Sequence, residues 1–228
     1  MHPVSPERLA WLAWLPILAT ALFYALPSDL QSDRAIQFLP QAVAYAALAL
    51  WVQHNAGITA RLGLRTPQIG QGLRWGIVAG LILGTANAGV ILQLVPRLGY
   101  DIAFLRETPH AQVPPAIMLP WLIVAIAMFV EVNFRGFLLG RLLALTERMV
   151  PVLPMPLVSC LAVGTTALTF SFDPFMVVTF RHLHWIALWD GLVWGLLWVR
   201  LRNLYVPIVA HTVEVMIMYS VIKMVLSA

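Results

Sequence analysis

Seven apolar segments, each close to the length that a helix needs to cross a bilayer, occupy most of the chain. A spanning helix needs roughly 20 apolar residues, because the hydrocarbon core is about 30 Å thick and each residue adds about 1.5 Å. We therefore predict an all-α fold, a polytopic integral membrane helical bundle of about seven transmembrane helices, with residues 1–228 forming a single transmembrane domain. The segments are Leu9–Leu26, Phe38–Gln53, Leu73–Val95, Ile117–Leu143, Leu157–Phe172, Leu183–Val199 and Tyr205–Leu226.

The composition excludes several classes of protein. Of the 228 residues, 61% are hydrophobic and only 11% are charged, whereas soluble domains carry about 25% charged residues. A soluble enzyme, a disordered chain and a DNA-binding module are therefore excluded. The formal net charge of +4 fits basic loops at a membrane surface, so the expected partner is the lipid bilayer and no nucleic acid is expected.

The basic residues alternate between connectors in a way that predicts orientation. We assign to the inside the connectors that hold Arg8, Arg61, Arg65, Arg74, Arg141, Arg148, Arg200 and Arg202. Cytoplasmic loops carry an excess of Lys and Arg, so the N-terminus is predicted to be cytoplasmic. The first apolar segment lacks an Ala-x-Ala cleavage site and is expected to be retained rather than removed as a signal peptide.

Several ionisable residues lie inside the predicted spans, where each is costly and indicates a functional site. Glu131 lies ten residues before Arg141, Asp190 ten before Arg200, and His211 nine after Arg202. At about 1.5 Å per residue, all three lie roughly 13–15 Å below the same membrane face. Three helices therefore bring polar groups to one depth.

Spacing predicts which of these groups share a helix face. Arg135 follows Glu131 by four residues, and Glu214 follows His211 by three, so each pair can interact directly. Two interpretations remain open: a buried ionic network that locks the bundle, and a polar cavity open to the cytoplasm in which a carboxylate and a histidine handle water or a proton.

No metal site is expected. The single cysteine, Cys160, excludes a cysteine-based cluster, and His182 and His184 are two residues apart and do not share a helix face. Nothing in the sequence indicates nucleotide, haem or flavin binding, so no cofactor is expected.

Two motifs carry a resemblance to a known family. Residues 130–138, VEVNFRGFL, resemble the first motif of the CAAX-protease and bacteriocin-processing (CPBP) intramembrane endopeptidases, Glu-Glu-x-x-x-Arg followed by Phe-Arg-Gly-x-Leu. Residues 203–211, NLYVPIVAH, resemble the Pro-Ile-x-x-His segment of the last motif. The resemblance covers about residues 115–220. It implies the multi-helix fold of that family and a bacterial cytoplasmic membrane. It makes Glu131 and His211 candidate catalytic residues, with Arg135 and Asn133 as candidate binding residues.

The sequence departs from the family pattern at positions that the resemblance links to hydrolysis. Val130 occupies the place of the first Glu, which the family uses to activate water. The expected second-motif histidine would fall near Ala167, and Val215 replaces the Asn of the last motif. Valine can neither accept a proton nor donate a hydrogen bond.

We therefore expect a catalytically degenerate relative that acts as a binding or assembly subunit in the membrane. Its partners would be other transmembrane helices or a larger complex, contacted through exposed aromatic surface or through glycine faces such as Gly76, Gly80 and Gly84. One alternative is an active endopeptidase with a rearranged site, in which Asp190 or Glu214 serves as a general base. A second alternative is a small proton-coupled transporter that uses the same charges as a relay.

Overall fold

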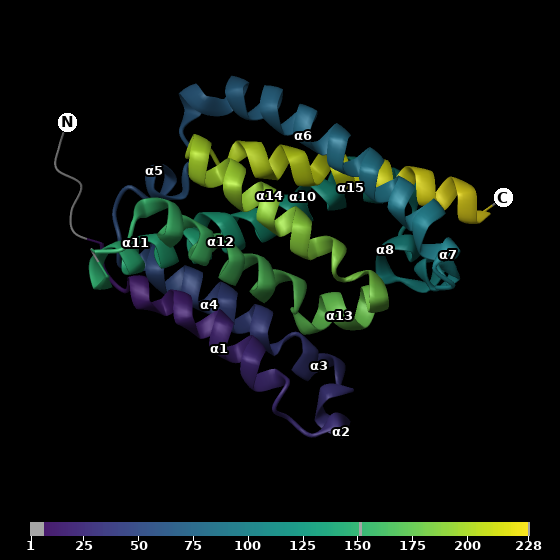
Figure 1. Ribbon diagram of the computed structural model, residues 1–228, viewed down its shortest axis with the longest axis horizontal. Helices are drawn as coiled ribbons and strands as arrows, with labels where there is room; N and C mark the ends of the chain where they lie inside the picture. Colours follow the sequence, from purple (N-terminus) through teal and green to yellow (C-terminus); the bar gives the residue numbers. More distant parts are fainter. Residues whose placement is uncertain (1–6, 151, 228) are drawn as a thin grey trace.

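The computed structural model describes residues 7–150 and 152–227, and every element in these ranges is helical (Figure 1). Residues 1–6, at the end of the predicted domain, lie outside the described residues. The main helices are α1 (Trp14–Phe23), α4 (Leu39–Gln53), α6 (Ile69–Gly89), α10 (Ile123–Glu131), α11 (Gly140–Met149), α12 (Met155–Ser171), α14 (Ile186–Leu201) and α15 (Tyr205–Ser227).

Shorter elements connect or extend these helices. The short α-helices are α2 (Ser28–Gln31), α3 (Arg34–Gln37), α5 (Ile58–Leu62), α7 (Val95–Arg97), α8 (Pro109–Gln112), α9 (Pro115–Ile117) and α13 (Pro174–Phe180). Turns of 3₁₀-helix are η1 (Ala10–Ala13), η2 (Thr66–Gln68), η4 (Ala103–Glu107) and η7 (Arg181–Leu183). Wider π-helical turns are η3 (Val90–Leu94), η5 (Met118–Leu122) and η6 (Val132–Leu139).

The all-α membrane bundle is confirmed. Each of the seven predicted apolar segments is largely helical in the structure. In the described part of the chain, three helical stretches are long and apolar enough to cross a membrane: Ile58–Arg97, Ile123–Met149 and Tyr205–Leu226. A fourth crossing is formed if Met155–Ser171 and Pro174–Leu183, which meet at a bend of 55°, are one span. The number of seven spans stays a prediction.

The helices pack in pairs. Helix α6 runs along α15, α12 along α14, and α1 along α4 (Figure 1). Helix α10 continues through η6 into α11. Its α10 part contacts α15, and its η6 part contacts α12 and α14. This continuous helix carries the first motif through the middle of the bundle.

Glycines allow α6 to approach α15 closely. A Cβ atom added to Gly76 would lie 2.5 Å from Cβ of Val209, and one added to Gly80 would lie 2.6 Å from the carbonyl oxygen of Ala210. In α14, a Cβ on Gly191 would lie 3.0 Å from Cβ of Ala167 in α12. The glycine faces are thus occupied within the chain, so the expectation that they contact another protein is not supported.

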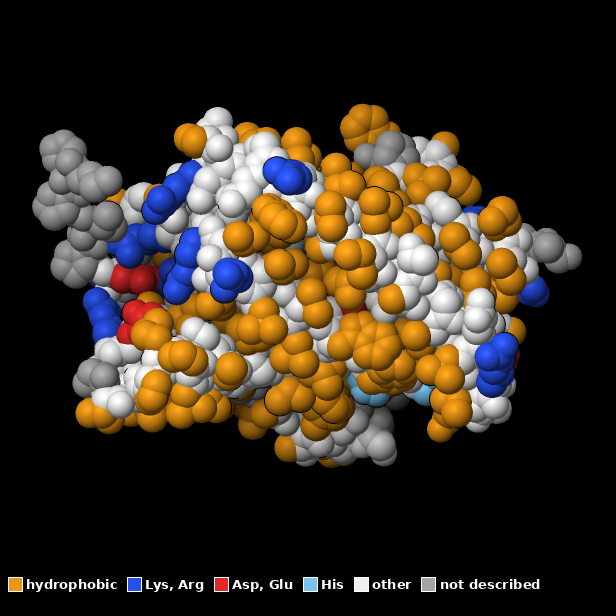
Figure 2. Space-filling view, turned by 45° about the horizontal axis from the view of Figure 1, so that its top comes forward, with side chains coloured by type: hydrophobic (Ala, Val, Ile, Leu, Met, Phe, Trp, Pro, Cys, Tyr) orange, Lys and Arg blue, Asp and Glu red, His pale blue; other side chains and the backbone are white. Residues whose placement is uncertain are grey.

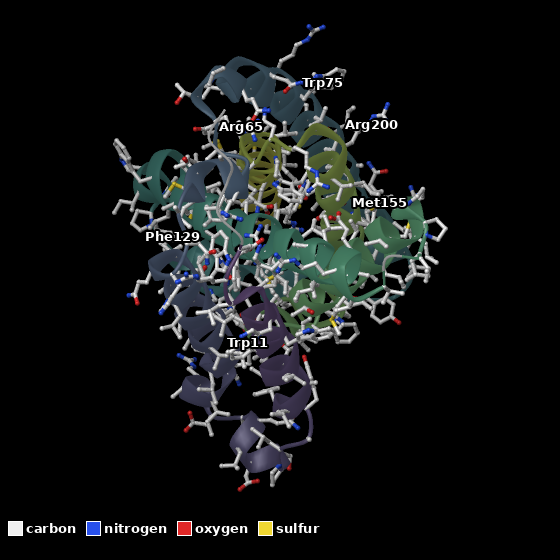
Figure 3. The ribbon with its side chains drawn as sticks, turned by 90° about the vertical axis from the view of Figure 1, so that its left-hand side faces the viewer. Trp11, Arg65, Trp75, Phe129, Met155 and Arg200 are labelled. Carbon is white, nitrogen blue, oxygen red and sulfur yellow. The ribbon has the colours of Figure 1, made fainter. Side chains whose placement is uncertain are left out.

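Charge is concentrated at the ends of the molecule. Apolar side chains cover the middle of the visible face, whereas most of its Lys and Arg side chains gather at the end that carries α5 and α11 (Figure 2). Viewed from that end, Arg65 and Arg200 lie in the half that contains α6, α14 and α15, and Trp11 lies in the half that contains α1 (Figure 3). We call this the arginine-rich end, and the opposite end, with α8 and the C-terminal turn of α15, the α8 end.

Candidate functional site

The first motif lies where the helix winding changes. The α-helix α10 ends at Glu131, and residues Val132–Leu139 form the π-helical stretch η6, which holds Asn133 and Arg135. Wider π-turns inside helices occur often at functional sites. Every residue from Asn133 to Leu139 is buried, so the motif faces the interior of the bundle rather than lipid.

Glu131 is the centre of a first cluster of ionisable side chains. The Nη1 atom of Arg135 donates to its Oε1 atom at 3.0 Å, and Nδ1 of His211 lies 2.9 Å from the same oxygen. Both Glu131 and Arg135 have an exposed fraction of 0%. The predicted pair in the first motif is therefore formed, and the histidine of the last motif joins it from α15.

Aromatic rings enclose this cluster. The ring of Trp194 stacks on His211 with a centroid distance of 4.5 Å and an interplanar angle of 19°. The guanidinium carbon of Arg135 lies 4.9 Å from the ring centroid of Phe170 and 5.0 Å from that of Trp194. Such cation–π contacts stabilise a buried guanidinium whose remaining nitrogens have no oxygen partner.

A second cluster joins Asp190 and Glu214 through Asn87 of α6. The Nδ2 atom of Asn87 lies 3.1 Å from Oδ1 of Asp190 and 2.6 Å from Oε1 of Glu214. The amide of Asn87 therefore holds the two carboxyl groups close together. The Nε1 atom of Trp189 donates to Oδ1 of Asn87 at 2.9 Å and thereby fixes the orientation of the amide.

A cavity of about 950 Å³ begins at these clusters. Its inner end is lined by Asn133, Asp190, His211 and Glu214, and its walls are mainly apolar side chains such as Ile123, Phe129 and Met218. Its other lining residues come partly from α1, α4 and α12, and partly from η4, α8, α13 and the C-terminal part of α15 toward the α8 end. A volume of this size suits a small-molecule ligand.

The cavity extends away from the arginine-rich end, whereas one interpretation of the sequence has a cavity open to the cytoplasm. Among the described residues, none of the arginines of the arginine-rich end lines it, whereas Arg106 and Lys223 at the other end do. The predicted orientation places the arginine-rich end in the cytoplasm, so a cytoplasmic opening is not supported. The spacing of residues along a helix gives depth below one face, and it does not determine which side of the bundle stays open.

Of the three residues that depart from the family pattern, two line the cavity and one is buried between helices. Val130 and Val215 both line the cavity, so methyl groups stand where the resemblance predicts a carboxylate and an amide. Ala167 is completely buried against Gly191. Glu131 and Arg135 do not line the cavity. The retained carboxylate is thus separated from the space in which a substrate would lie.

Asn87 and the tryptophans around it were missed by sequence reasoning. The segment that holds Asn87 was interpreted only through its glycines, although a buried amide in a predicted span is a signal of its own. Asn87 is 1% exposed and connects both carboxyl groups of the second cluster. For a metal ion, the described residues provide no group of three or more His, Cys, Asp or Glu side chains.

Comparison with known proteins supports the resemblance. A family model described as Type II CAAX prenyl endopeptidase Rce1-like matches residues 112–217, just under half of the chain. This range agrees with the 115–220 segment expected from the two motifs, and it includes Glu131, Arg135, Asp190, His211 and Glu214. No curated protein and no solved structure matches the chain.

Proposed function

We propose that the chain is a catalytically degenerate member of the CAAX-type intramembrane endopeptidases, which the match of residues 112–217 to the Rce1-like family model supports. In this proposal the bundle binds a partner in the membrane and does not hydrolyse a peptide. The family fold supplies a helical scaffold with a polar centre, and the chain uses that scaffold as a binding or assembly element.

One observation carries the proposal: the side chain of Glu131 is shielded from the cavity, and one of its oxygens already has two partners. Its Oε1 atom contacts both Arg135 and His211, and its side chain has no exposed surface. A general base must reach the water that it activates, directly or through one intervening water. A carboxylate that neutralises a buried guanidinium away from the cavity is placed for structural stabilisation instead.

The cavity lining supports the same proposal. Val130 and Val215 face the space in which a scissile bond would lie, and neither side chain can move a proton or stabilise an oxyanion. Active hydrolysis would need a carboxylate and a hydrogen-bond donor at such positions. The cavity itself is retained, which is what a binding protein derived from an enzyme needs.

Purified protein tests the loss of hydrolysis. In lipid nanodiscs with a prenylated or membrane-embedded peptide, we expect the wild-type chain, Glu131→Gln and His211→Ala to give the same background, measured by mass spectrometry of the products. Cleavage by the wild type that is lost in both variants would overturn the proposal.

A second candidate is an endopeptidase with a rearranged site. Asp190, His211 and Glu214 all line the cavity, and two carboxyl groups that share a proton can act as acid and base. This candidate predicts that alanine at Asp190 and at Glu214 abolishes a demonstrated activity. An activity that survives both substitutions excludes it.

We also propose a bacterial cytoplasmic membrane as the location, with a cytoplasmic N-terminus. The resemblance to the bacteriocin-processing family supports the first part. The concentration of basic side chains at one end, where Arg65 and Arg200 lie, supports the second.

A further inference from the structure

The inner end of the cavity holds two acidic side chains that have no ion-pair partner among the described residues. In the first cluster Glu131 neutralises Arg135. In the second, Asp190 and Glu214 contact the neutral amide of Asn87 and not a cation. No lysine or arginine of residues 7–150 and 152–227 forms an ion pair with either of these two carboxyl groups. A buried charge inside a membrane is costly unless a counter-charge accompanies it.

Buried acceptor atoms at the same place have no partner. The Oε2 atom of Glu214 and the Oδ1 atom of Asn133 make no hydrogen bond in the described part of the chain. Glu214 is 0% exposed, Asn133 is 3% exposed, and both line the cavity. Because unpaired buried acceptors cost free energy, the site favours an occupant that donates hydrogen bonds.

The chemistry of the walls defines the rest of the occupant. Beyond the acceptors the cavity continues for several helical turns between apolar side chains, including Ile123, Phe129, Met218 and Ile222. Its other end is lined by Lys223, nine residues or about 13 Å along α15 from Glu214. The space therefore suits an apolar chain. A divalent metal ion is not favoured, because the described residues offer no set of three ligating side chains.

We propose that this cavity binds an amphipathic ammonium compound, with its primary ammonium group against Asp190 and Glu214 and its apolar chain along the walls. The ammonium places a positive charge beside the two carboxyl groups and donates hydrogen bonds to the acceptor oxygens. This inference deepens the proposed binding function by naming the class of ligand. It does not depend on the absence of hydrolysis.

The alternative class of ligand is an anionic amphiphile, which would bind at the α8 end. Arg106 and Lys223 line the cavity there, but the Nζ atom of Lys223 already donates to the carbonyl oxygen of Ala111 at 3.2 Å and to the hydroxyl of Tyr219 at 3.0 Å. The bond to Ala111 ties α15 to α8. The unpartnered carboxylate oxygen at the inner end is the stronger determinant, and it would repel an anionic group.

The test uses the full chain in nanodiscs of phosphatidylcholine. Saturable binding of radiolabelled dodecylamine, dodecanoate and dodecanol, three probes with the same chain length, is measured at pH 7. We expect dodecylamine to bind at least about tenfold more tightly than the other two, the difference that one charge-assisted hydrogen bond supplies. Absence of saturable dodecylamine binding, or tighter binding of dodecanoate, would overturn the proposal without any variant.

Variants then locate the site. The isosteric double variant Asp190→Asn with Glu214→Gln should lose at least about tenfold in affinity for dodecylamine, while Glu147→Gln, at an exposed carboxylate outside the cavity, should retain it. Equal affinity in the double variant and wild type contradicts the site. Peptide cleavage is measured separately, so a failure here leaves the test of catalytic degeneracy unaffected.

Discussion

The imidazole of His211 lies 2.9 Å from a carboxylate oxygen of Glu131, although 80 residues separate them in the chain. The same oxygen accepts a hydrogen bond from Arg135 at 3.0 Å. The two residues that the resemblance links to catalysis thus hold each other and a buried guanidinium in one network. In such a network the carboxylate serves mainly as a counter-charge.

Replacing Glu131 by Gln should strongly destabilise the protein. The substitution leaves Arg135, which is 0% exposed, without its ion pair, and breaking one partner of a buried pair costs about 3–5 kcal/mol. Thermal unfolding in detergent should show a large decrease in Tm. The double variant Glu131→Gln with Arg135→Met should recover part of this loss, because it removes the isolated charge.

The control for this experiment is Glu147→Gln, which makes the same chemical change at an exposed position. Exposed substitutions of this kind change stability by less than about 0.5 kcal/mol. If Glu131→Gln behaves like Glu147→Gln, the network does not stabilise the bundle and Glu131 is retained for another reason.

Part of this site could be predicted because helical spacing is regular. Counting residues from Arg141, Arg200 and Arg202 placed Glu131, Asp190 and His211 at one depth, and the structure brings Glu131 and His211 into contact. Pairing of Glu131 with Arg135 followed from their separation of four residues. These inferences require only that each segment is a helix.

The remaining features depend on contacts between distant helices. Asp190 contacts Asn87, which also binds Glu214, and does not pair with Glu131; no helical periodicity determines which neighbour a residue meets. Arg141, used as a marker of the cytoplasmic surface, is buried and forms an ion pair with Glu7. The cavity results from how far α10, α13 and α15 are held apart, which the sequence pattern does not specify.

Substitution of Gly80 by Ala should weaken the contact between α6 and α15. The added Cβ would lie 2.6 Å from the backbone oxygen of Ala210, and backbone cannot move aside without shifting the helix. We expect a loss of about 1–3 kcal/mol, typical of overpacking. Gly89→Ala, also in α6 but with no atom within 4 Å of the added Cβ, should be neutral or stabilising by up to about 1 kcal/mol. Equal effects of the two substitutions on Tm would contradict this packing.

Stability should decrease when the pH falls below about 6.5 in a way that depends on His110. This histidine lies in α8, outside the predicted spans, where its ring stacks on Phe180 with a centroid distance of 5.9 Å. Burial lowers the pKa of His110 from its ordinary value of 6.5. Between the lowered pKa and 6.5 the unfolded chain binds more protons than the folded one, so stability is fully present above 6.5 and decreases as the pH falls.

The measurement is the difference in Tm between pH 7.5 and pH 5.5 for the wild type and His110→Gln. Other groups titrate in this range in both proteins, and only the part that differs between them belongs to His110. We expect a smaller decrease in the variant. A variant that loses as much stability as the wild type would show that His110 is solvated.

Orientation in the membrane can be measured by cysteine labelling in a Cys160→Ala background. Arg65 and Arg97 are both exposed arginines and lie on the connectors before and after the third predicted span. In intact bacterial cells a membrane-impermeant maleimide should label Arg97→Cys and not Arg65→Cys, because basic loops stay in the cytoplasm. Permeabilised cells should label both. The cavity, which runs toward the α8 end, would then receive its ligand from the external side; labelling of Arg65→Cys alone in intact cells would reverse this direction.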